Sequence, residues 1–78
     1  MAAEDFFTDR AFEKMKHYGL SKSDVVTAMS SGDYRDCTIP GATHKVTYLK
    51  HKGLMVGVIF KAVPGGRRVV ISCWGRKQ

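Results

Sequence analysis

The sequence predicts an α+β domain in which two N-terminal helices pack on three or four antiparallel strands (ααββββ). Apolar residues recur at helical spacing up to Gly32 and alternate with period two from Thr43 onwards. The chain has 78 residues, so we expect a single domain over residues 1–78. Because an amphipathic helix and a half-apolar sheet each need a cover, one sheet face should carry both helices.

The first helix is expected between Thr8 and Gly19. Thr8 is a candidate N-cap, and Asp9 follows in the first turn, where the helix dipole favours a negative charge. Phe7 and Phe12 are spaced as a hydrophobic staple around this cap. The predicted apolar stripe consists of Ala11, Phe12, Met15 and Tyr18. Gly19 should end the helix in the left-handed conformation.

The second helix is expected from about Ser21 to Ser31. Ser21 and Asp24 fit a capping box, and Gly32 should end the helix. The expected buried face is Val25, Val26, Ala28 and Met29. Because so few residues separate the two helices, they should form a tight corner or hairpin.

The strands are expected after Gly32. A short strand over Tyr34–Cys37 is followed by the chain break at Pro40-Gly41. Three longer strands should then form an antiparallel meander through two short connections, at Thr43–Lys50, Leu54–Lys61 and Arg67–Trp74. The middle one is apolar on both sides and should be central. Strict alternation places Arg68, Val70, Ser72 and Trp74 on one side of the last strand.

Positive charge is concentrated in the second half of the chain. The net charge is +6, yet residues 1–36 carry five Lys or Arg against seven Asp or Glu, and residues 37–78 carry eight Lys or Arg and no acid. Such a segment attracts polyanions, and we expect RNA or another nucleic acid as partner. The alternative is that the charge serves solubility alone.

Several other classes of protein are not favoured. The longest apolar run, Leu54–Phe60, has seven residues, and no charged n-region precedes an apolar h-region, so we expect a cytoplasmic protein with no membrane partner. Cys37 and Cys73 are too few for a disulfide scaffold and are expected to be structural thiols. No zinc-finger spacing and no phosphate-binding glycine motif is present, so neither metal nor cofactor is expected.

Cationic residues alternate with aromatic ones in the basic half. Phosphates need charge and unstacked bases need flat partners, so this mixture suits RNA. The candidate nucleic-acid-binding residues are Lys45, Lys50, Lys52, Arg67, Arg68, Trp74 and Arg76. Candidate catalytic residues for metal-independent cleavage by the ribose 2′-OH are His44, His51, Arg68 and Tyr48, since such cleavage needs an acid, a base and a cation. Alternatively, Tyr48 and Trp74 belong to the core and both histidines are simply solvated.

A motif at residues 10–21 carries a family resemblance. Ala11, Met15, Gly19, Leu20 and Ser21 match the pattern His-Ala-x-x-Arg-Met-x-x-Arg-Gly-Ile/Leu-Ser, in which Arg10, Lys14 and Tyr18 replace the His and the two Arg. This pattern is typical of a small family of uncharacterised proteins within the barnase–EndoU–colicin–RelE superclass. With its two helices, meander and basic C-terminal half, the chain resembles the RelE-like toxins. The resemblance implies the ααββββ fold, action on RNA, and an antitoxin as partner.

Three functional hypotheses follow. The first is a RelE-like ribonuclease toxin or an inactive relative of one. The second is a non-enzymatic module that binds RNA or DNA. The third is a protein-interaction module whose cationic face meets an acidic, antitoxin-like partner.

Overall fold

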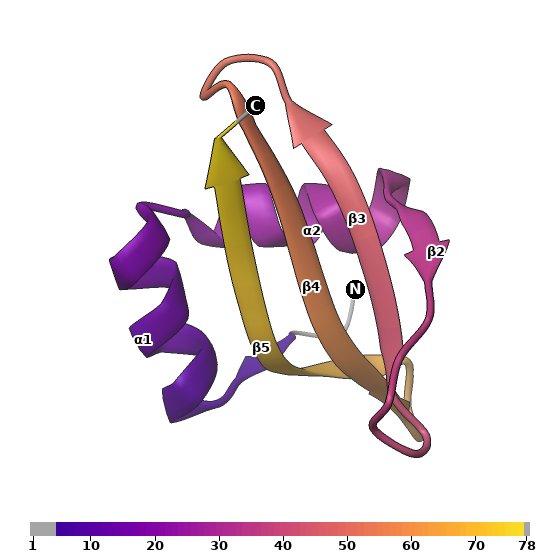
Figure 1. The fold of residues 1–78 in the computed structure, drawn as a ribbon. Helices are drawn as coiled ribbons and strands as arrows, with labels where there is room; N and C mark the ends of the chain where they lie inside the picture. Colours follow the sequence, from indigo (N-terminus) through magenta and orange to yellow (C-terminus); the bar gives the residue numbers. More distant parts are fainter. Residues whose placement is uncertain (1–4, 78) are drawn as a thin grey trace.

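The computed structural model describes residues 5–77, which form two helices and one five-stranded sheet (Figure 1). The helices are α1 (Asp9–Tyr18) and α2 (Lys22–Ser31). The strands are β1 (Phe6–Phe7), β2 (Asp33–Arg35), β3 (Thr43–Leu49), β4 (Leu54–Val63) and β5 (Arg67–Lys77). Their order in the sheet is β1-β5-β4-β3-β2, and only the β1–β5 pairing is parallel among the described strands.

The α+β class is confirmed, whereas the prediction of a purely antiparallel sheet of three or four strands is wrong. The sheet is mixed because Phe6 and Phe7 add a parallel strand beside Val69 and Val70. Thr8 fixes this addition, since its backbone N–H donates to the Val70 carbonyl at 3.1 Å and its hydroxyl lies 3.0 Å from the same oxygen. The observed β2 also begins one residue earlier and ends two residues earlier than the short strand predicted there.

Both helices begin and end where the capping residues predict. The Ala11 N–H donates to the Thr8 hydroxyl at 3.1 Å, and Gly19 ends α1 with φ at +69°. At α2 both bonds of the capping box are present, from Ser21 N–H to the Asp24 carboxylate (3.0 Å) and from Asp24 N–H to the Ser21 hydroxyl (3.1 Å). Neither of these two helices has the length and apolar character that a membrane span requires.

The core lies on one side of the sheet. Helix α2 runs behind β4 and β3, and α1 lies beside β5 (Figure 1). The buried residues come from both helices and from the strand faces turned toward them, and include Ala11, Val25, Ala28, Val56, Val58, Val70 and Cys73. Within residues 5–77 no helix covers the opposite face, which we call the open face (Figure 1).

A bulge in β5 changes which residues share a face. Ile59 pairs with Ser72 and Phe60 with Val70, so that Ile71 is an extra residue in β5. Val70 and Cys73 are therefore both buried toward the helices although they are three residues apart. The strict alternation predicted for this strand is wrong for the same reason: Arg68 points to the helix side, while Ser72 and Trp74 point to the open face.

Candidate nucleic-acid interface

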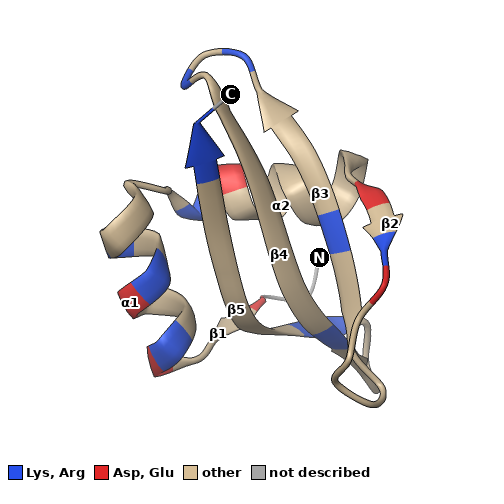
Figure 2. Ribbon diagram, viewed as in Figure 1, with Lys and Arg blue, Asp and Glu red and all other residues tan. Residues whose placement is uncertain are grey.

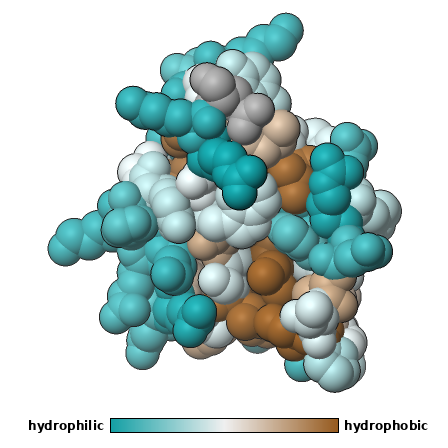
Figure 3. Space-filling view, in the orientation of Figure 1, coloured by the Kyte–Doolittle hydropathy of each residue, from teal (hydrophilic) through white to brown (hydrophobic). Residues whose placement is uncertain are grey.

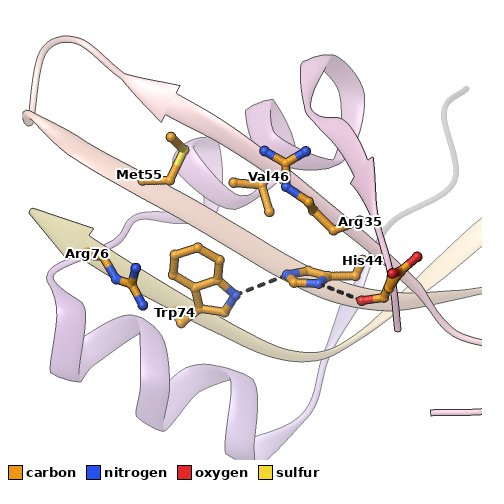
Figure 4. Close-up of a pocket in the computed structure, with 7 residues that line it drawn as sticks. Arg35, His44, Val46, Met55, Trp74 and Arg76 are labelled. Atoms are coloured by element: carbon orange, nitrogen blue, oxygen red, sulfur yellow. Dashed lines mark hydrogen bonds between the residues drawn. The ribbon is translucent and has the colours of Figure 1, made fainter. Parts of the chain in front are cut away.

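The open face contains a concavity of about 520 Å³ in its middle (Figure 4). It is formed by side chains of β3, β4 and β5 and by the end of β2. The lining residues are Arg35, Asp36, His44, Val46, Met55, Trp74 and Arg76. Its volume falls within the range of about 300–1,000 Å³ that is usual for small-ligand sites.

Trp74 lies flat on the backbone of β4. It pairs across the strands with Gly57, and a Cβ atom at Gly57 would lie only 2.2 Å from the indole atoms Cε2 and Nε1. Any side chain at this position would lift the indole away from the sheet. One face of the indole is thus covered by bare backbone, and Trp74 as a whole remains partly exposed.

A hydrogen bond to His44 fixes the direction of the indole. The Trp74 Nε1–H donates to His44 Nε2 at 3.1 Å (Figure 4). An indole nitrogen can only donate, so His44 Nε2 is the acceptor and the proton of the neutral imidazole lies on Nδ1. That proton points to the backbone carbonyl of Asp36, 3.3 Å from Nδ1. Both ring nitrogens of His44 are therefore occupied.

Two arginines lie at the rim of the concavity. Arg76 lies beside Trp74 on β5, and Arg35 lies on the opposite side, on β2 (Figure 4). Among the described residues that line the concavity, Asp36 is the only one with a carboxylate. The space-filling view shows apolar surface in the middle and lower part of the open face, with hydrophilic side chains around it (Figure 3). The site thus combines a partly exposed aromatic ring with two guanidinium groups.

The structure brings some of the sequence-predicted residues together on this face. His44, Trp74 and Arg76 line the concavity itself. Tyr48 lies on the same side of β3 as His44 and is 47 % exposed, and Lys50 follows in the exposed turn after β3. Arg67 is exposed at the start of β5, the opposite end of that strand from Arg76.

His51 and Lys52 instead contact a buried carboxylate on the helix side. Lys52 Nζ lies 2.6 Å from one oxygen of Asp24 and 2.7 Å from the Gly19 carbonyl oxygen. His51 Nε2 lies 3.2 Å from the other oxygen of Asp24. Burial alone would raise the pKa of Asp24, but the hydrogen bonds from Lys52 and Ser21 and the charge of Lys52 outweigh burial and lower this pKa to about 2.

Arg68 and Lys45 also face the helix side. The Arg68 guanidinium forms two parallel hydrogen bonds of 2.9 Å with the carboxylate of Asp5. Lys45 Nζ donates to the Met29 carbonyl at 2.9 Å and lies 4.7 Å from the centre of the Tyr34 ring. The cations of the basic half are thus divided between the two sides of the sheet. Along the chain, the ribbon shows Lys and Arg in the turn after β3 and at the end of β5, among other places (Figure 2).

Sequence reasoning missed four parts of the concavity. Arg35 and Asp36 belong to residues 1–36, which carry a net negative charge, so the search for basic residues in the second half did not include them. Met55 and Val46 read as ordinary apolar strand residues. Arg35 enters the site because the strand register places it opposite His44. One signal in the sequence did point to the site: Gly57 interrupts the apolar strand β4, and a glycine inside a strand often marks the close approach of another group, here Trp74.

No group of three His, Cys, Asp or Glu side chains able to hold a metal ion is found within residues 5–77. Both cysteines are free thiols. Burial raises the pKa of Cys73 to about 11, although the positive charge of Lys14 opposes this rise. Cys73 is therefore suited to packing rather than to nucleophilic attack at neutral pH.

Comparison of the chain with protein-family models found no match, and neither the search of curated proteins nor the search of solved structures found a similar protein.

Proposed function

We propose that the open face binds single-stranded RNA, with one base stacked on Trp74 and the adjacent phosphates held by Arg76 and Arg35. Stacking on an aromatic side chain contributes about 1–3 kcal/mol per base, and guanidinium groups bind phosphate through paired N–H donors. Unpaired bases expose the flat surface that such stacking needs, whereas bases within a duplex do not.

The observation that carries this proposal is the held position of the indole. Gly57 leaves room for it on the sheet, and its bond to His44 fixes its direction. A side chain held in this way loses little freedom when a ligand stacks on it, which favours binding. A tryptophan whose role is to fill the core would be expected on the helix side of the sheet, whereas Trp74 lies on the uncovered face beside two arginines.

The hydrogen bonds of His44 favour binding over cleavage. A general base must accept a proton from the ribose 2′-OH, and the only acceptor nitrogen of this ring already accepts the hydrogen bond from the Trp74 Nε1–H. His51 is bonded to Asp24 on the helix side, away from the concavity. We therefore propose that the domain binds RNA without cutting it, which corresponds to the non-enzymatic hypothesis.

The division of the cations predicts weak salt dependence. If Arg35 and Arg76 make the phosphate contacts and one neighbouring cation assists, two or three phosphates are neutralised. The logarithm of the binding constant should then fall with the logarithm of salt concentration at a slope of about −1.4 to −2.1, since each contact on a single strand contributes about −0.7. A slope near −5 would instead require both sides of the sheet to contact RNA.

The test is fluorescence anisotropy with a labelled single-stranded RNA of about 12 nucleotides. Trp74→Leu and Arg76→Gln should each weaken binding by about tenfold, because a stacked base or a phosphate contact is lost. Arg68→Gln, which removes a cation from the helix side, is the matched control and should bind like the wild type. Equal loss in all three variants, or no binding of the wild type at low salt, contradicts the proposal. RNA recovered intact from the same samples separates binding from cleavage.

A further inference from the structure

Strand β2 forms an uncovered end of the sheet. It is the last strand in the sheet order, and all three of its residues are exposed. No other element of residues 5–77 lies on its outer side (Figure 1). The other end of the sheet is different, because β1 pairs with β5 there and α1 packs beside it. Free backbone groups along an exposed edge strand are a template for pairing with another strand.

The sequence of β2 is complementary to itself in charge. It reads Asp33-Tyr34-Arg35, with opposite charges on either side of a central residue. If a second copy pairs antiparallel about a two-fold axis at Tyr34, Asp33 of each chain lies opposite Arg35 of the other. Opposite charges at directly opposed positions stabilise strand pairing, whereas like charges there destabilise it. Both residues lie on the open face, since they pair with Val46 and His44 of β3.

The central residue fits the same arrangement. Tyr34 is 74 % exposed, the highest value among the exposed large hydrophobic residues of the described chain. Its ring faces the helix side, where Lys45 lies over it. On a two-fold axis the two Tyr34 rings would lie directly opposite each other, and an aromatic cross-strand pair would bury surface that the single chain leaves in water.

We propose that β2 pairs with β2 of a second copy, so that two five-stranded sheets become one continuous ten-stranded sheet. A two-fold axis normal to the sheet keeps both open faces on the same side. The two Trp74 concavities then face one direction, and one RNA strand could contact both. In this dimer Asp33 of the second copy lies beside Arg35 at the rim of the concavity, and Trp74 and Arg76 are unchanged. Asp33 is not among the lining residues, so Asp33→Arg tests dimer formation, while Trp74→Leu and Arg76→Gln test RNA binding.

The test is sedimentation equilibrium over a range of protein concentrations, with charge reversals at β2. Asp33→Arg places two arginines opposite each other twice per dimer and should raise the dimer dissociation constant at least about tenfold. The double variant Asp33→Arg/Arg35→Asp restores opposite charges with the order reversed, and its constant should return to within about threefold of the wild-type value. Since both side chains are exposed, circular dichroism and the thermal unfolding midpoint should change little.

A second measurement locates the axis. In a Cys37→Ser background, Tyr34→Cys should form an intermolecular disulfide under mild oxidation, because directly opposed Cα atoms lie about 4.5–5.5 Å apart, a distance that suits this bond. Lys16→Cys, on the exposed surface of α1, is the control and should stay monomeric. A wild type that remains monomeric up to about 0.5 mM, a concentration that would populate even a weak dimer, overturns the proposal. So does a dimer that is insensitive to Asp33→Arg.

Discussion

At the scale of single residues, Gly57 decides where Trp74 can lie. Gly57→Ala would place a Cβ atom 2.2 Å from the indole, so the ring must turn away and lose its bond to His44. We expect the free energy of unfolding to fall by about 1–3 kcal/mol and RNA affinity to fall as in Trp74→Leu. The change is measured by urea unfolding and by the emission of the single tryptophan.

Gly75→Ala is the matched control for this substitution. Its Cβ atom would lie 3.3 Å from Tyr18 Cβ, a tight contact that a small shift can relieve. It should leave the emission spectrum and RNA binding close to those of the wild type. Unchanged emission in Gly57→Ala would contradict the flat placement of the indole on β4.

The two thiols should react differently. Cys73 is 1 % exposed, and burial raises its pKa to about 11, so little thiolate forms at pH 8. Cys37 lies in the partly exposed segment after β2. Iodoacetamide at pH 8 should therefore label Cys37 in the folded protein and both thiols in urea, as read by mass spectrometry. Labelling of Cys73 at the same rate as Cys37 in the folded protein would contradict its burial.

Sequence alone identified His44, Trp74 and Arg76 as site candidates because they are imidazole, aromatic and cationic side chains in the half of the chain that has no carboxylate. It could not place Arg68, because the extra residue Ile71 shifts the alternation between Arg68 and Trp74. Local sequence patterns could not predict the contacts of His51 and Lys52 with Asp24 either, because these contacts join residues that are 27 and 28 positions apart.

At the scale of elements, Asp24 joins the start of α2 to the turn between β3 and β4. Its pKa lies at about 2 in the folded protein against 3.8 ordinarily, so its carboxylate contributes about 2 kcal/mol of stability above pH 4. This contribution is lost as the pH falls from about 4 to about 2, where the folded protein takes up the proton. Asp24→Asn should therefore lower the free energy of unfolding by about 2 kcal/mol at pH 7 and by much less near pH 2.

The measurement is urea unfolding of both proteins at several pH values between 7 and 2. Asp36→Asn removes a carboxylate from the open face, where no ion pair depends on it within the described residues, and serves as the control. A constant difference between wild type and Asp24→Asn across the whole pH range would show that Asp24 acts by packing instead of by charge.

The elements that local signals define were predicted closely. Thr8, Gly19, Ser21 and Gly32 bound the two helices as capping residues, and the observed bounds agree with them. Strand β1 was missed because two residues carry no periodic pattern, and its pairing with β5 joins positions more than sixty residues apart. A strand of this kind follows from tertiary contacts that no local pattern records.

At the scale of the whole molecule, the distribution of charge along the sequence does not predict how charge is distributed over the surface of the fold. The basic half of the chain forms β3, β4 and β5, and a strand places alternate side chains on opposite faces. Lys45 and Arg68 therefore point to the helices, where Met29 and Asp5 receive their hydrogen bonds. Instead of a continuous basic surface, the open face offers an aromatic plane between two arginines, one of them from the acidic half.

The most direct test of the proposed RNA site is a two-dimensional ¹H–¹⁵N NMR titration with unlabelled single-stranded RNA. The chain has one tryptophan, so one indole N–H signal reports on the bond between Trp74 and His44. We predict that this signal and the backbone amides of β3, β4 and β5 around the concavity shift on binding, while those of α1 and α2 do not. Shifts confined to the helices, or an unchanged indole signal at saturation, would contradict RNA binding at the open face.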